Sequence, residues 1–85
     1  MNPEQMTAEI RAKVVELAAR LGNDASSVPD DEILPFTGML DSAGLMELVA
    51  WYEQHFAITL SQDEVNIDNL GSIQAMVQFA ATRTR

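Results

Sequence analysis

The stretch TGMLDSAG, residues 37–44, marks the point where a long polar loop gives way to an amphipathic helix. Beyond it, apolar side chains recur at helical spacing and fall within roughly 100° of one another on a helical wheel. These core positions are Leu45, Leu48, Val49, Tyr52 and Phe56. The spacing therefore predicts a helix over about 42–56, with Ser42 at its start and at the edge of its apolar stripe.

Another helix is predicted on the N-terminal side. Asn2-Pro3 offers an N-cap followed by a proline at the first helical position. Apolar residues follow at spacings of four, four, three and four, which places them on one helix face: Met6, Ile10, Val14, Leu17 and Leu21. Gly22-Asn23 supplies a stop, so the first helix should cover about 3–21.

Between these two helices the periodicity fails. Residues 22–41 are rich in serine, proline and glycine, which predicts a long loop. We expect its apolar residues to pin it to the core: Val28, Ile33, Leu34 and Phe36. Loops of this length inside a compact domain usually have a function.

The C-terminal part should contain a short helix and a longer one. Ser61-Gln62-Asp63-Glu64 has the pattern of a capping box, which predicts a short third helix over about 62–67. The last helix should cover about 70–82 and bury Ile73, Met76, Val77 and Ala80. No segment has a convincing strand pattern. The expected fold is all-α, a small four-helix bundle of three main helices plus the short third helix, forming one domain over 1–85.

Composition bounds the class of protein. The chain has 85 residues, of which 47% are hydrophobic and 21% charged, as expected of one globular domain. No apolar run approaches the roughly 20 residues that span a bilayer, so we expect no direct membrane insertion. The absence of cysteine excludes disulfides and thiolate metal sites, and a single histidine points to no other metal site. Together with a start that does not resemble a secretory signal, the absence of cysteine predicts a cytoplasmic protein.

Charge is distributed unevenly along the chain. The net charge is -8, and residues 21–82 contain ten acids but no lysine or arginine. Such a surface repels nucleic acid and anionic membranes, and it steers basic protein surfaces towards the domain. Plain solubility is the alternative explanation of the same acidity.

Ser42, with Asp41 before it, is the one credible point for chemistry in the chain. A helix N-terminus favours negative charge, so a serine there suits the attachment of a phosphate-linked group. Nothing would activate the hydroxyl, because His55 lies 13 residues away and points about 140° away on the helical wheel. We therefore expect another enzyme to perform the attachment and no catalysis by this chain. The alternative is that Asp41-Ser42 only caps the helix, and Gly44 then reflects tight packing on the loop.

From about Leu34 to Ala80 the sequence resembles the phosphopantetheine-binding carrier proteins. The resemblance rests on the aspartate and serine that open the second main helix and on further residues at family spacings: Glu47-Leu48, Phe56, Ile58 and 69–73. Gly38 and Gly44 around the serine resemble the D-alanyl carriers and the free-standing aminoacyl carriers. Fatty-acid carriers more often have a leucine where this chain has Ala43.

The resemblance implies a carrier protein whose Ser42 receives 4'-phosphopantetheine from coenzyme A, with Asp41 orienting the site. The thiol of that arm would hold an amino acid as a thioester. A fatty or polyketide acyl chain is the alternative cargo, and a cofactor-free helical adaptor is the further alternative. The implied partners are a phosphopantetheinyl transferase, an adenylate-forming ligase and a downstream acyl or aminoacyl transferase or synthase, met by a monomeric carrier.

Partner recognition is assigned to four residues of the second main helix: Leu45, Met46, Glu47 and Glu53. A core position for Leu45 and a solvated helix face for the two glutamates are the alternatives. A sizeable apolar pocket near Met46 and Ile67 would favour a long acyl cargo.

Two further expectations concern the end of the second main helix and the position of Trp51. Carriers often have a glycine where Ala57 stands, and alanine is strained in a left-handed turn, so we expect the second main helix to end differently. Trp51 lies on the flank of the core stripe, and we expect it to be partly buried against the loop or the third helix.

Overall fold

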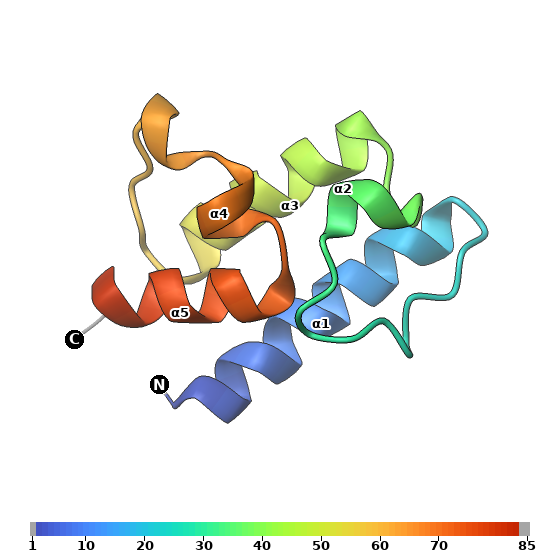
Figure 1. The fold of residues 1–85 in the computed structure, drawn as a ribbon, viewed down its shortest axis with the longest axis horizontal. Coiled ribbons are helices and arrows are strands. Elements are labelled where there is room, and N and C mark those ends of the chain that lie inside the picture. Colours follow the sequence, from blue (N-terminus) through green and yellow to red (C-terminus); the bar gives the residue numbers. More distant parts are fainter. Residues whose placement is uncertain (1, 84–85) are drawn as a thin grey trace.

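The structure, a computed structural model, describes residues 2–83 (Figure 1). Its main helices follow the amphipathic pattern of the sequence. The helices are α1 (Pro3–Arg20), α2 (Leu34–Thr37), α3 (Ser42–His55), α4 (Ile67–Leu70) and α5 (Ile73–Arg83), with one 3-10 turn, η1, at Gln62–Glu64. No strand occurs in this part of the chain, and the all-α prediction is confirmed. α1 packs against both α3 and α5, while α4 packs against α5. None of the helices within residues 2–83 is long and apolar enough to cross a membrane.

α1 begins at its predicted cap. The Asn2 side chain accepts a hydrogen bond from the Gln5 backbone N–H at 2.7 Å, which satisfies one of the free donors of the first turn. The first four positions of the predicted face are buried: Met6, Ile10, Val14 and Leu17. Leu21 is 45% exposed, so its assignment to that face is wrong. The helix ends before Leu21, because the chain turns away at Gly22, which has a φ of 80°.

The segment before α3 is not irregular throughout, as the sequence predicted, because it contains the four-residue helix α2. Leu34 anchors α2 with only 1% exposure, and its backbone N–H donates to the carbonyl of Gly71 at 2.7 Å. Gly38, with a φ of 74°, ends the helix in the left-handed region. Phe36 is 78% exposed, so the expectation that it pins the loop is wrong. A hydrogen bond to a carbonyl far along the chain fixes α2, and no local pattern could reveal that bond.

The capping box forms as expected, but the helix after it is shorter than predicted. The Glu64 side chain accepts from the Ser61 backbone N–H at 2.9 Å, yet only the single turn η1 follows. Asn66 then caps a separate helix, α4, by accepting from the Asn69 N–H at 2.8 Å. The prediction of one helix over 62–67 is therefore wrong: this range holds only η1, and α4 begins at its last residue, Ile67, and runs to Leu70.

The last helix begins at Ile73 instead of about residue 70. The Ser72 hydroxyl accepts a hydrogen bond from the Ala75 N–H at 3.0 Å, as an N-cap does. Gly71 stands at the corner between α4 and α5, where a Cβ would overlap the carbonyl oxygen of Ile67. Glycine is needed at this corner because no side chain fits.

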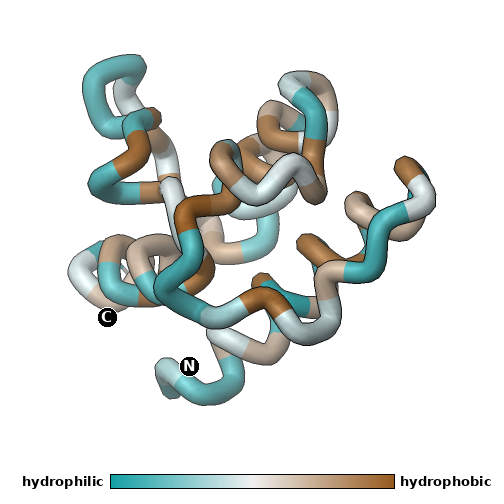
Figure 2. The backbone as a smooth tube through the Cα atoms, turned by 45° about the vertical axis from the view of Figure 1, so that its right-hand side comes forward, coloured by the Kyte–Doolittle hydropathy of each residue, from teal (hydrophilic) through white to brown (hydrophobic). Residues whose placement is uncertain are grey.

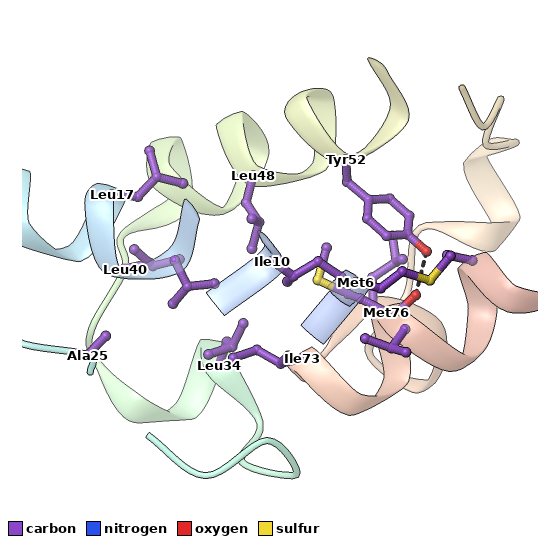
Figure 3. Packing of buried hydrophobic residues seen from close by; sticks show 14 of the residues in the cluster. Met6, Ile10, Leu17, Ala25, Leu34, Leu40, Leu48, Tyr52, Ile73 and Met76 are labelled. Atoms are coloured by element: carbon purple, nitrogen blue, oxygen red, sulfur yellow. Dashed lines mark hydrogen bonds between the residues drawn. The ribbon is translucent and has the colours of Figure 1, made fainter. Parts of the chain in front are cut away.

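The core lies between α1, α3 and α5, with α2 closing one end (Figure 3). Side chains labelled in Figure 3 converge from each element, including Ile10, Leu48 and Ile73, all at most 2% exposed. The Tyr52 hydroxyl donates to the carbonyl of Met76 at 2.7 Å and ties α3 to α5. Burial raises the pKa of Tyr52, so its hydroxyl stays protonated and can donate this bond. The tube in Figure 2 alternates between hydrophobic and hydrophilic residues along the helices, as amphipathic helices should.

α3 ends in a left-handed turn in spite of its alanine. Ala57 has a φ of 55°, and the Ile58 N–H donates to the carbonyl of Glu53 at 2.9 Å, the long bond of a Schellman turn. The expectation that this helix ends differently is therefore wrong. Burial of Phe56 and Ile58, on either side of the turn, holds the alanine in its strained conformation.

Candidate functional site

The start of α3 separates the roles of its two polar residues. Asp41 is the N-cap, with extended backbone and a carboxylate that accepts from the Gly44 N–H at 2.7 Å. Ser42 is the first residue of the helix and is exposed. Within residues 2–83 its side chain has no hydrogen-bond partner. Helix capping therefore explains Asp41 and leaves the serine hydroxyl unused.

Gly44 is explained by packing at the cap. A Cβ at this position would lie 3.1 Å from Oδ1 of Asp41 and 3.6 Å from Cβ of Leu40. The first contact is tighter than usual, so the carboxylate of Asp41 would have to shift by a few tenths of an ångström, whereas the contact with Leu40 is an ordinary one. The geometry supports the interpretation of Gly44 as the result of tight packing on the preceding loop.

The loop that leads into Ser42 is fixed by hydrogen bonds from both sides. The Thr37 hydroxyl donates to the carbonyl of Leu34 at 2.7 Å and accepts from the Met39 N–H at 3.1 Å. The Asn23 side chain, at the end of α1, donates to the carbonyl of Met39 at 3.0 Å. Leu40 is 5% exposed and fills the core beneath the cap. These contacts place an exposed hydroxyl on a rigid support.

No basic side chain of the described residues is free to serve this site. Lys13 pairs with Glu16, and the other pairs are Arg11 with Asp30, Arg20 with Glu16 and Glu47, and Arg83 with Glu64. The hydrogen bond that Arg20 donates to Glu47 raises the pKa of Arg20, and the one that Lys13 donates to Glu16 lowers the pKa of Glu16, as expected of ion pairs. Within residues 2–83, the attraction for an anion at Ser42 therefore comes from the N-terminus of α3, a helix of 14 residues.

An apolar groove runs beside α3, one turn beyond Ser42. It is open to solvent, has a volume of about 200 Å³, and is lined by Pro35, Leu45, Met46, Leu48, Val49, Val65, Asn66, Ile67, Leu70 and Gly71. Three of these side chains are large, apolar and exposed, namely Met46 (64%), Ile67 (46%) and Val65 (41%). The sequence indicated Met46 and Ile67, but it gave no signal for Pro35 or Val65. Neither belongs to a periodic pattern: Pro35 reaches the groove from α2, and Val65 reaches it from the segment between η1 and α4.

The four predicted recognition residues are not equivalent in the structure. Leu45 is half-buried and packs on the core, whereas Met46 projects from the helix. Glu47 is exposed but bonded to Arg20 at 2.7 Å. Glu53 is half-buried and accepts from the Leu60 N–H at 3.1 Å, so it holds the segment that follows α3. Only Leu45 and Met46 line the groove beside Ser42.

Trp51 and His55, near the end of α3, face α1. Trp51 is half-buried and stacks on His55, with ring centroids 4.7 Å apart and an interplanar angle of 17°. Both rings border a hollow with Ala12, Lys13 and other residues of α1. The partial burial of Trp51 is as predicted, but α1 covers it instead of the loop or the third helix.

Comparison with known proteins gives one match. The model of the family described as "Phosphopantetheine attachment site" matches residues 12–80, which include Ser42 and all of α2, α3 and α4. No curated protein and no solved structure shows significant similarity to the chain. Among residues 2–83 no group of histidine and acidic side chains is arranged to hold a metal ion.

Proposed function

The chain belongs to the phosphopantetheine attachment site family, and from this premise we propose that Ser42 is the residue that bears the 4'-phosphopantetheine. Domains of this family carry that group covalently and generally perform no catalysis themselves. When bound, the group supplies a terminal thiol that holds cargo as a thioester. The single observation that carries the assignment is the exposed Ser42 hydroxyl, which has no hydrogen-bond partner among residues 2–83 while the neighbouring Asp41 caps the helix.

The residues at the start of α3 fit a phosphate-bearing group. Ser42 is at the positive end of a 14-residue helix, which stabilises a nearby phosphodiester by roughly 0.3 to 1 kcal/mol. Asp41 keeps the first turn in place through Gly44, and this is the orienting role that we propose for it. The histidine, His55, is at the opposite end of α3, and the Asp41 carboxylate beside Ser42 is engaged by the Gly44 N–H. The transferase therefore has to supply the base that takes up the serine proton.

We propose an amino acid as the cargo. The Gly38 and Gly44 pattern and the alanine at position 43 support this choice, as they match the aminoacyl carriers better than the fatty-acid carriers. One observation favours the alternative, a fatty or polyketide acyl chain: the apolar groove bordered by Met46 and Ile67. That groove is open and, at about 200 Å³, below the ~300 to 1,000 Å³ of typical ligand pockets. It suits a short chain better than a long one.

Partner enzymes are proposed to dock beside Ser42, on Leu45 and Met46, with Glu47 and Glu53 contributing charge. Met46 is the strongest of the four, because its side chain is 64% exposed and borders the groove. The net charge of -8 disfavours a second copy of this chain as the occupant and favours a basic enzyme surface. An adenylate-forming ligase and a phosphopantetheinyl transferase are the proposed partners of a monomeric carrier.

Modification in vitro tests the assignment of Ser42. The purified protein is incubated with coenzyme A, magnesium and a broad-specificity phosphopantetheinyl transferase, and its intact mass is measured. We expect the mass of one arm to be added, no addition to Ser42→Ala, and normal addition to Ser27→Ala, which removes another exposed serine. An unmodified wild type, or a Ser42→Ala protein that still gains the arm, would refute the proposal. Charging of the holo form by an aminoacyl-adenylating enzyme, and not by an acyl-activating one, would support the amino-acid cargo, and the reverse would overturn it.

A further inference from the structure

One large apolar side chain of α2 has no place in the core. Phe36 is 78% exposed, more than any other large hydrophobic residue within residues 2–83. Burial of an aromatic ring is among the largest apolar gains that a side chain offers, and the isolated fold forgoes it here. Attachment of a group to Ser42 does not by itself explain this exposure.

The geometry of α2 turns the ring outwards. Leu34 points into the core and is 1% exposed (Figure 3). Successive residues of a helix are about 100° apart, so Phe36 lies about 200° from Leu34, on the opposite side of α2. The Leu34 N–H donates to the carbonyl of Gly71 at 2.7 Å, and the Phe36 N–H donates to the carbonyl of Ile33 at 3.0 Å. A fixed backbone therefore presents the ring to solvent.

α2 lies beside the beginning of α3, where Ser42 is (Figure 1). Pro35, which precedes Phe36, lines the same groove as Leu45 and Met46. Phe36 and Met46, at 78% and 64%, are the two most exposed large hydrophobic residues among residues 2–83. They therefore belong to neighbouring elements, and an enzyme that reaches Ser42 approaches the face that these elements form.

The chain on both sides of Phe36 is acidic. Asp31 and Glu32, which precede α2, are exposed, and neither forms an ion pair with another of residues 2–83. Asp30, just before them, is engaged by Arg11, and Asp41 is exposed at the start of α3. Residues 21–82 contain no lysine or arginine. Such a surface repels a second copy of this chain, whose net charge is also -8, and attracts a basic surface.

We propose that Phe36 anchors the docking of the phosphopantetheinyl transferase, whose surface offers an apolar pocket for the ring inside a basic rim. This inference rests on the proposed function of Ser42, and it extends the docking surface from α3 to α2. An aromatic side chain surrounded by polar groups is the usual composition of a binding hot spot. The ring contacts the enzyme and not the reacting atoms, so it contributes to binding of the carrier and not to the chemical step.

Steady-state kinetics of the modification test this role. Initial rates are measured by intact mass with coenzyme A, magnesium and the broad-specificity transferase, at increasing concentrations of the full chain. Phe36→Ala should lower kcat/KM about tenfold or more, through a higher KM for the carrier with nearly unchanged kcat. Phe36→Leu keeps an apolar side chain and should lose less. Both variants should melt close to the wild type, because the ring is exposed.

Matched variants separate the ring and its acidic surroundings from general effects. Val65→Ala trims another exposed apolar side chain, on the segment between η1 and α4, and should keep the wild-type kcat/KM. Glu32→Gln should lower kcat/KM at low salt, and added salt should reduce this loss because it screens the attraction. Glu4→Gln removes an exposed acid in the first turn of α1 and should cause no such loss.

The inference is overturned if Phe36→Ala keeps the wild-type kcat/KM, or if Val65→Ala loses as much. A wild-type dimer that Phe36→Ala converts to a monomer would also overturn it, because a second copy would then cover the ring. After long incubation Phe36→Ala should still gain one arm, since Ser42 is intact. A wild type that gains no arm refutes the proposed function and this inference together, whereas a modified wild type with an unimpaired Phe36→Ala refutes this inference alone.

Discussion

Replacement of Ala57 by glycine should make this protein more stable. Ala57 follows α3 with a φ of 55°, where an L side chain places Cβ too close to the next carbonyl oxygen. The residue is exposed, so removal of its methyl group leaves no cavity in the core. The turn itself is held by the bond from Ile58 to Glu53, which glycine would keep.

The size of the effect follows from two opposing terms. Relief of the left-handed strain stabilises the folded protein by roughly 1 to 2 kcal/mol. Glycine also gives the unfolded chain more conformational freedom, which destabilises the folded protein by about 0.5 to 1 kcal/mol. The net gain therefore lies between about 0 and 1.5 kcal/mol, with a midpoint of about 0.75 kcal/mol. For a domain of 60 to 100 residues the midpoint corresponds to an increase in melting temperature of about 3 to 6 °C.

Thermal and urea unfolding followed by circular dichroism would measure this gain. Ala50→Gly is the matched control, because Ala50 is exposed in the middle of α3 and should lose about 0.5 to 1 kcal/mol on the same substitution. If Ala57→Gly lowers the melting temperature, or both variants change alike, the left-handed turn described for α3 is incorrect.

Three further predictions concern the site and the charges. Asp41→Ala should lower the unfolding free energy by about 1 kcal/mol through loss of the N-cap, whereas Ser42→Ala should change it by less than about 0.5 kcal/mol. Urea unfolding of both variants measures the two changes, and a larger loss for Ser42→Ala would contradict the assignment of Asp41 as the cap. Met46→Ala should lower kcat/KM of the transferase or ligase roughly three- to tenfold with an unchanged melting temperature, and an equal rate would remove Met46 from the docking surface. Hydrogen bonds from His55 and Ser26 lower the pKa values of Glu9 and Asp24, so these carboxylates contribute stability above their ordinary pKa values. That contribution should disappear as pH falls through the lowered values, and a melting temperature that stays level in acid would contradict it.

The parts of the fold that the sequence predicted are those specified by neighbours along the chain. Spacing of apolar residues indicated the buried face of α1, and the Asn2-Pro3 cap located its start. α2 could not be predicted in the same way, because four residues carry no periodicity and the bond from Leu34 to Gly71 is set by tertiary packing. The capping box at Ser61 was found, but local pattern could not show that Asn66 begins a new helix four residues after η1 starts.

The same distinction applies to the candidate site: neighbours along the chain specify some of its features, and tertiary packing specifies the others. Sequence placed Asp41 and Ser42 at a helix start, yet only the geometry shows which of them bonds to the Gly44 N–H. Glu53 looked like a surface acid, but it accepts a hydrogen bond from the backbone of a segment whose position is set by the whole fold. The pairing of Glu9 with His55 spans 46 residues, and no short-range signal predicts it.

Every lysine and arginine within residues 2–83 is paired with an acidic neighbour, and this pairing affects how a carried group moves. On the proposed assignment, a phosphodiester on Ser42 finds no uncommitted lysine or arginine among residues 2–83, and one covalent link at the rim of α3 anchors the arm. The countercharge then comes from each visiting enzyme, and between visits the arm is free to swing.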